Sequence, residues 1–240
     1  MFELITTYKD SEYLWAYILV FIFAILVAMC SHEYAHARVA YSCGDDTAKL
    51  AGRMTLNPVK HFSLLGILCF LFAGFGWATP VPINPLKFKE YRKGIFLTSI
   101  AGVVTNFIIC FVACGFSVFI MSFSSSVANI TEFYIIYFLA LFFAYLSQIN
   151  LSLCIFNLLP LYPLDGYNIL RSVTKGTNKF VNFLGRYGHI ILLVLVFSTL
   201  LETGMSYAVS NILNPINMFW MKILYGMVED GRKNWVRRKN

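Results

Sequence analysis

The stretch Tyr13–Tyr41, YLWAYILVFIFAILVAMCSHEYAHARVAY, joins a membrane-spanning segment to a metal-binding motif. Its first 18 residues, Tyr13 to Cys30, form an apolar run long enough to be the body of a transmembrane helix. The end of this helix contains His32, Glu33 and His36 in the pattern H-E-x-x-H. Residues four apart share one helix face, so both imidazoles can bind one metal ion. Glu33 lies beside that face, where a carboxylate can act on a water molecule.

A chance match is a poor explanation for this motif. The composition predicts roughly two accidental H-E-x-x-H matches per thousand such chains. The alternative is an interfacial helix end whose polar residues simply meet water. A carboxylate near membrane depth costs about 2.5 kcal/mol or more unless something stabilises it. A bound cation would provide that stabilisation.

The composition is that of a protein embedded in the lipid bilayer. Of the 240 residues 58% are hydrophobic, and the mean hydropathy is +0.67, which is typical of a polytopic membrane protein. The net charge of +7 comes from basic residues in short loops between apolar runs. This pattern indicates positive-inside topology, and we expect no nucleic-acid partner. The sequence does not indicate the oligomeric state or the identity of a substrate.

We predict an all-α polytopic membrane protein with about five transmembrane helices, a re-entrant segment and a small membrane-associated β-sheet. Phe62 to Ala78 lies between two basic loops, so it should enter and leave on the same side, as a re-entrant segment does. Alternating patterns predict strand-like stretches over Ala48 to Leu56 and Val81 to Phe88, which could receive an unwound substrate by strand addition. Loop charges place the C-terminus and the active helix ends in the cytoplasm. We predict a single domain, 1–240, with a catalytic core over about 13–170 and C-terminal helices over about 187–227. The predicted spans are Tyr13–Cys30, Ile95–Phe123, Phe133–Tyr162, Ile190–Leu201 and Met205–Met227.

A catalytic zinc site normally has three protein ligands, so one ligand beyond the two histidines is needed. Asp165 is the strongest candidate, because it follows a span that must end on the cytoplasmic side and two prolines break the helix before it. The alternative is that Asp165 only caps a helix beginning at Gly166. His61 lies in a loop that suggests a surface or headgroup role, and His189 begins another span, where capping or snorkelling is more usual.

Four amide side chains in the apolar segments between residues 95 and 162 are candidates for a role in the site or in helix packing. Asn157 approaches Asp165 and either donates to a developing oxyanion or joins two helices, and the sequence favours neither. The other three, Asn106, Gln148 and Asn150, are predicted to form interhelical hydrogen bonds.

Several motifs in the same order resemble the site-2 protease family of intramembrane zinc metalloproteases, in its compact bacterial form without PDZ or CBS domains. The resemblance implies that His32, His36 and Asp165 bind one Zn²⁺, that Glu33 activates water, and that the substrates are transmembrane proteins or peptides. It also implies a multi-pass protein of the bacterial plasma membrane. One departure is Val103, where relatives often have proline. The matching motifs are HEYAHA (His32 to Ala37), GRMTLNPVKH (Gly52 to His61), FGWATPVPINP (Phe75 to Pro85), AGVVTN (Ala101 to Asn106) and NLLPLYPLDG (Asn157 to Gly166).

Two alternative functions are less well supported. An HtpX-type membrane protease also uses H-E-x-x-H, but its third ligand is a glutamate within a helical E-x-x-x-D/E pattern. Glu90, Glu132 and Glu202 have no acidic residue four positions later. A zinc-binding membrane scaffold without proteolytic activity would not need Glu33, because a structural site has no use for a general base.

Overall fold

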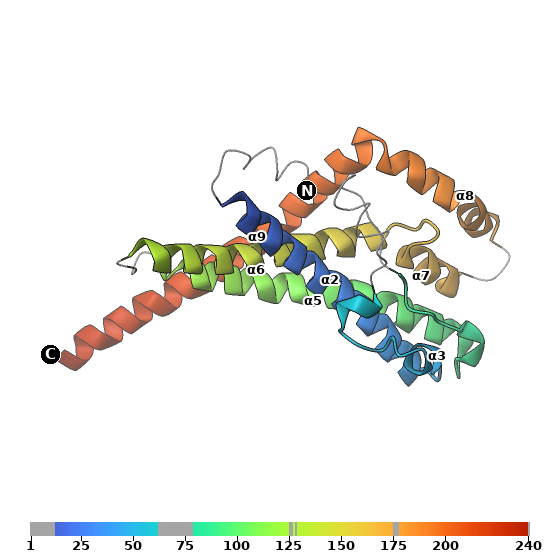
Figure 1. The fold of residues 1–240 in the computed structure, drawn as a ribbon, viewed down its shortest axis with the longest axis horizontal. Helices are drawn as coiled ribbons and strands as arrows, with labels where there is room; N and C mark the ends of the chain where they lie inside the picture. The colour runs from blue at the N-terminus through green and yellow to red at the C-terminus, as the bar shows by residue number, and fades with distance from the viewer. Residues whose placement is uncertain (1–12, 62–78, 125–126, 128, 175–177, 240) are drawn as a thin grey trace.

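A computed structural model describes residues 13–61, 79–124, 127, 129–174 and 178–239. Three long helices form its centre, and α5 and α6 run antiparallel beside one another while α2 crosses both (Figure 1). The connection after α6 leads into a short helix, α7, and then into α8 and α9. The main helices are α2 (Leu14–Ser42), α5 (Tyr91–Met121), α6 (Ile130–Asn157), α7 (Asp165–Val173), α8 (Lys179–Val196) and α9 (Thr199–Lys239).

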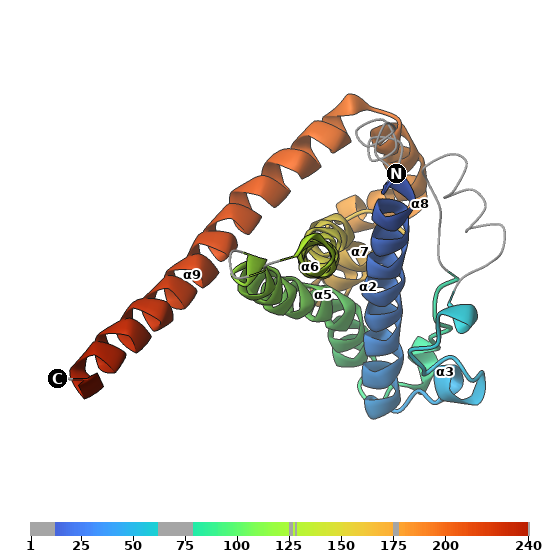
Figure 2. The same cartoon turned by 60° about the vertical axis from the view of Figure 1, so that its left-hand side comes forward.

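Small side chains allow the three central helices to approach one another closely. Ala24 and Ala28 of α2 are fully buried and pack with Ala113 of α5 and Leu146 of α6. Close backbone approach through small residues is a common way to pack helices in a membrane, where burial of apolar surface from water contributes little. Helix α9 packs across α5 and α6, where Trp220 Nε1 donates to the Phe111 carbonyl at 2.9 Å, and its C-terminal end extends beyond the bundle (Figure 2).

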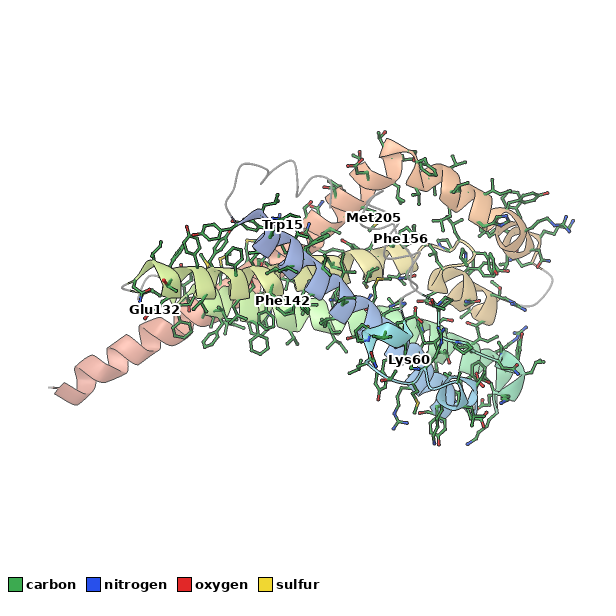
Figure 3. The ribbon with its side chains drawn as sticks, in the orientation of Figure 1. Trp15, Lys60, Glu132, Phe142, Phe156 and Met205 are labelled. Atoms are coloured by element: carbon green, nitrogen blue, oxygen red, sulfur yellow. The ribbon has the colours of Figure 1, made fainter. Side chains whose placement is uncertain are left out.

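The outer surface of the bundle is apolar, as expected for a protein in lipid. Large hydrophobic side chains point outward from the helices, including Trp15, which is 74% exposed (Figure 3). Four of the described helices are long and apolar enough to cross a membrane: α2, α5, α6 and α8. Helix α9, which contains the predicted fifth span, is not among them. The predicted span Ile190–Leu201 is also misplaced, because α8 ends at Val196 and α9 begins at Thr199.

The predicted small β-sheet is wrong for the described residues, which contain no strand. Thr47–Leu50 is a short helix, α3, and Gly52, with φ of +65°, follows it in a turn. Pro58–Lys60 and Pro85–Lys87 are 3₁₀ turns, η1 and η2. Each begins at the proline of an Asn–Pro pair. The asparagine side chain accepts from the backbone N–H two residues later, and the proline fixes φ for the turn. The predicted re-entrant segment Phe62–Ala78 lies outside the described residues.

The C-terminal end of α2 is tied to the segment that leads into α5. Gly44 adopts φ of +111° and closes a Schellman motif, in which Asp45 N donates to the Ala40 carbonyl at 2.9 Å. The buried carboxylate of Asp45 then accepts from the N–H of Thr47 at 3.0 Å and from the N–H of Asn84 at 2.6 Å. Two loops far apart in sequence are therefore held together beside the end of α2.

Candidate metal centre

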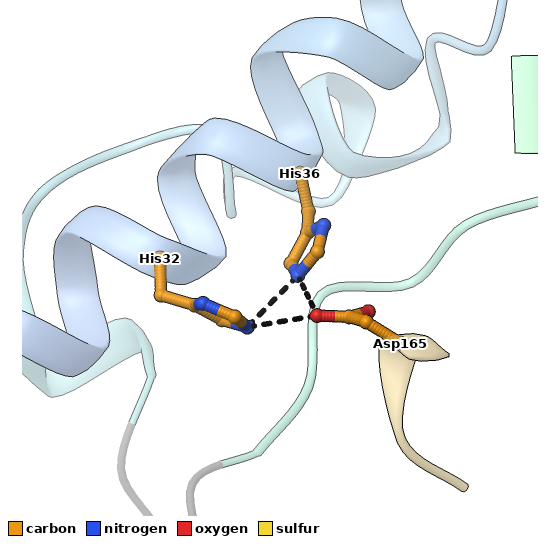
Figure 4. A group of neighbouring side chains, drawn as sticks. All are labelled: His32, His36 and Asp165. Carbon is orange, nitrogen blue, oxygen red and sulfur yellow. Dashed lines mark hydrogen bonds and ion pairs between the residues drawn. The ribbon is translucent and has the colours of Figure 1, made fainter. Parts of the chain in front are cut away.

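Helix α2 places two histidines side by side within the bundle. His32 and His36 are one turn apart and only 8% and 6% exposed. Their Nε2 atoms lie 2.9 Å apart and point to the same place (Figure 4). The i, i+4 spacing of the motif therefore brings the two imidazole nitrogens to one place, as the sequence predicts.

The first residue of α7 brings a carboxylate to the two imidazoles. Asp165 Oδ2 lies 3.3 Å from His32 Nε2 and 3.2 Å from His36 Nε2 (Figure 4). Helix α6 ends at Asn157, before the prolines, and the chain turns back through Leu158–Leu164. This return requires Gly166, because a Cβ there would collide with the carbonyl oxygens of Leu158 and Leu159. The N-cap position of α7 is Leu164 and no side-chain hydrogen bond caps the helix, which argues against the alternative that Asp165 only serves as a cap.

Helix α5 closes the third side of the centre. The Thr98 carbonyl accepts a hydrogen bond from His36 Nδ1 at 2.7 Å. Gly102, one turn later, leaves room for both rings, because a Cβ on it would lie 2.5 Å from His32 Cε1 and from His36 Nε2. Any larger residue at position 102 would therefore displace an imidazole.

The chemistry of the three side chains fits a divalent metal ion. Because His36 Nδ1 donates to a carbonyl, the neutral ring carries its lone pair on Nε2, facing Asp165. Asp165 Oδ2 is buried and forms no hydrogen bond with the described residues, although two nitrogens lie close to it. A tetrahedral zinc ion with bonds of about 2.0–2.1 Å separates its ligand atoms by about 3.3 Å. The separations of 3.2 and 3.3 Å between Asp165 and the two histidines agree with this value, and the 2.9 Å between the two Nε2 atoms is somewhat shorter.

The pKa of the Asp165 carboxyl lies below its usual range, which suits a metal ligand. Burial by itself raises its pKa, but the contacts with His32 and His36 outweigh burial and hold the pKa at about 2. Among the described residues, His32, His36 and Asp165 form the one group of His, Cys, Asp and Glu side chains that could hold a metal ion, with ligand atoms within 4.8 Å of one another.

Glu33 lies beside this group and has a different partner. Its Oε2 accepts a hydrogen bond from the backbone N–H of Val81 at 2.9 Å. The segment that contains Val81 is itself fixed, because Thr79 N donates to the His61 carbonyl at 2.7 Å and Arg53 Nη1 donates to the Thr79 carbonyl at 3.3 Å. Glu33 is therefore positioned from outside the helix that carries it.

The predicted surface or headgroup role of His61 is wrong. The side chain is fully buried, and its Nε2 donates to the Thr55 carbonyl at 2.7 Å. His61 therefore supports the segment that reaches Glu33 and takes no part in the metal group. His189 is exposed on α8 and also lies outside that group.

Within the described part of the chain, the amide side chains show none of the predicted hydrogen bonds between helices. Asn157 Nδ2 donates to the Leu153 carbonyl of its own helix at 3.1 Å, and its role in oxyanion binding stays a prediction. Asn150 also bonds within α6, to Leu146, and Gln148 is exposed. Asn106 is fully buried, and neither of its amide atoms bonds to a described residue.

Thr98 and Gly102 are functional positions that the sequence reasoning missed. Thr98 acts through its backbone carbonyl, which carries no sequence signal. Gly102 lies within the motif AGVVTN, but a glycine in an apolar segment reads equally well as ordinary helix packing.

Comparison with known proteins, like the geometry, points to a zinc-binding protein. The model of Peptidase family M50 matches residues 20–201. The chain is 43% identical over 180 residues to "Putative zinc metalloprotease YwhC" of Bacillus subtilis (strain 168), covering 75% of this chain and 80% of that protein. It is 26% identical over 202 residues to "Putative zinc metalloprotease Rip2" of Mycolicibacterium smegmatis, covering 82% of this chain and 73% of that protein.

No solved structure matches the chain. The family match covers most of the chain, including all four residues around the candidate metal centre. With four helices apolar enough to span a bilayer, the chain is a multi-pass membrane protein. It belongs to peptidase family M50, the site-2 protease family of zinc metalloproteases.

Proposed function

We propose that this protein hydrolyses peptide bonds in or near the transmembrane segments of membrane proteins, with one zinc ion per chain. The observation that carries the proposal is the convergence of His32, His36 and Asp165 within a bundle of membrane-spanning helices, with Glu33 beside them. A soluble peptide does not need an active site built into such helices, whereas a substrate embedded in the bilayer needs an active site within the membrane.

The four side chains have two roles, metal binding and proton transfer. His32, His36 and Asp165 would hold zinc through two Nε2 atoms and one Oδ2 atom. When bound, zinc supplies Lewis acidity that polarises a carbonyl and lowers the pKa of water to about 7. Glu33 takes up the proton of the attacking water and passes it to the leaving amine. The Val81 N–H holds one oxygen of Glu33 in place during this exchange.

The substrate must unwind before its peptide bond can be attacked, because a helix keeps its carbonyls in internal hydrogen bonds. The loops beside the metal centre are basic, with Lys49, Arg53 and Lys87 near the end of α2, which supports an active site toward the cytoplasmic side. Both relatives are bacterial proteins, and we place this chain in a bacterial plasma membrane.

Cleavage of a reconstituted substrate tests the proposal. The purified full-length chain in proteoliposomes should cleave a helical transmembrane substrate, a chelator should abolish cleavage, and stoichiometric zinc should restore it. His32→Ala is the matched inactive variant. Cleavage that survives both chelation and His32→Ala would contradict the proposal, and so would a zinc-loaded protein that cleaves none of a panel of helical membrane substrates.

A further inference from the structure

A cavity outside the metal centre lies at the end of the bundle that we propose to be cytoplasmic. It has a volume of about 410 Å³ and lies between the start of α5, helix α7 and the first turns of α8. Figures 1 and 2 show α7 beside the start of α8. Ile95 and Val181 give it apolar walls. Its polar lining comes from Tyr91, Arg92, Tyr167, Arg171, Ser172, Thr174, Asn178 and Asn182.

The charged side chains among the described residues that line this cavity are both positive. They are Arg92 and Arg171, and no described lining residue is a carboxylate. Neither arginine forms an ion pair with the described residues, and the nearby Glu90 already pairs with Lys93 at 3.0 Å. The one hydrogen bond of these guanidinium groups within the described part of the chain is long, from Arg171 Nη2 to Tyr91 Oη at 3.5 Å. Two exposed guanidinium groups are therefore available to an anion.

The chemistry and the position of the cavity identify the anion. The planar fork of arginine matches the oxygens of a phosphate group, to which it can donate two parallel hydrogen bonds. The cavity lies at the N-terminal end of α5, a helix that spans the membrane, so it lies at the depth of the lipid headgroups. Its apolar walls suit the glycerol and acyl carbons next to a headgroup.

We propose that this cavity binds a phosphate group, supplied by an anionic phospholipid of the surrounding leaflet. Three lining residues, Tyr167, Arg171 and Ser172, belong to α7, the helix that begins at Asp165. A bound headgroup therefore contacts the helix that carries the third candidate metal ligand. The proposal itself does not depend on proteolysis, because binding can be measured without zinc and without substrate.

Lipid binding to matched charge variants tests the proposal. The full-length protein is delipidated in neutral detergent and titrated with phosphatidylglycerol and, separately, with phosphatidylcholine, with binding followed by native mass spectrometry. Wild type should prefer phosphatidylglycerol, and the double variant Arg92→Gln/Arg171→Gln should lose about tenfold or more of that affinity. The control, Arg38→Gln/Arg186→Gln, removes two exposed charges that do not line the cavity and should bind as wild type does.

A competition experiment on the wild-type protein shows whether the bound phosphate comes from a lipid headgroup or from free phosphate. If millimolar inorganic phosphate leaves phosphatidylglycerol bound, the cavity takes a lipid headgroup. If inorganic phosphate displaces the lipid, and its own binding requires the two cavity arginines, the cavity takes free phosphate. Equal loss of affinity in both double variants would show attraction to general surface charge and overturn the proposal. Equal affinity of wild type for the two lipids would overturn it as well.

Discussion

Glu33 and its three neighbours have different contacts, and these contacts predict different effects of mutation. His32, His36 and Asp165 face one another, whereas Glu33 accepts from the Val81 N–H. We expect Glu33→Gln to keep its zinc, because the amide oxygen can still accept from Val81 and no metal ligand is lost. The rate of cleavage should fall by about 10²- to 10⁴-fold, since glutamine cannot take up a proton. Zinc content and single-turnover cleavage measure the two effects separately.

The matched comparison for this variant is His36→Ala, which should lose both zinc and activity. If Glu33→Gln lost zinc as completely as His36→Ala, the carboxylate would be a metal ligand and its assignment as the general base would be wrong.

The sequence could identify site residues that lie close together along the chain, or whose side of the membrane follows from the order of the spans. His32, Glu33 and His36 lie within two helical turns, so their geometry follows from helix periodicity. Asp165 follows a span that returns to the same side. The burial of His61 is not encoded in a local pattern, and its backbone carbonyl pairs with Thr79, which is distant in sequence.

Among the helices, the close packing of α5 against α2 depends on Gly102, because a glycine has no side chain. Gly102→Ala would place a methyl group 2.5 Å from His36 Nε2 and His32 Cε1. We expect this substitution to lower zinc occupancy and activity together, because either an imidazole or the whole of α5 must move. The control is Gly204→Ala in α9, where an added Cβ meets nothing within 4 Å. Wild-type zinc occupancy in Gly102→Ala would contradict the close approach of the two helices.

The long helices could be predicted from their apolar runs, and the short elements could not. The alternation from Ala48 to Leu56 predicted a strand, but nine residues distinguish a period of two from a turn of helix only weakly. The better local signals were the two Asn–Pro pairs and Gly52, which favour turns. Asp165 likewise lies where a helix cap is usual, and only the fold shows that its side chain turns to the histidines instead.

In the whole molecule, the hydrogen bonds between the loops predict which chain segments share a side of the membrane. Thr79 N bonds to the His61 carbonyl and Asn84 N bonds to Asp45, so Lys60 and Lys87 lie at the same end of α2. Helix α5, with 31 residues and a length of about 46 Å, carries the chain to the opposite side before Asn129. Single cysteines at positions 60 and 87 should therefore react with an impermeant maleimide only from the cytoplasmic side.

A cysteine at position 129 should react from the external side, and the wild-type chain provides the background from its native cysteines. Lysed membranes should label all three positions. Reaction of the position 60 and position 87 variants from opposite sides would contradict the arrangement of the loops around α2.

The zinc content of Asp165→Asn tests the central claim most directly. An amide of nearly the same shape removes the charge and most of the affinity for zinc while it leaves the fold of α7 intact, since Asp165 forms no cap. The measurement is the ratio of zinc to protein, by plasma mass spectrometry, in wild type, Asp165→Asn and the exposed-histidine control His189→Ala. We expect about one zinc per chain in wild type and in His189→Ala, and close to none in a folded Asp165→Asn. Full zinc occupancy in Asp165→Asn would contradict the metal centre described above.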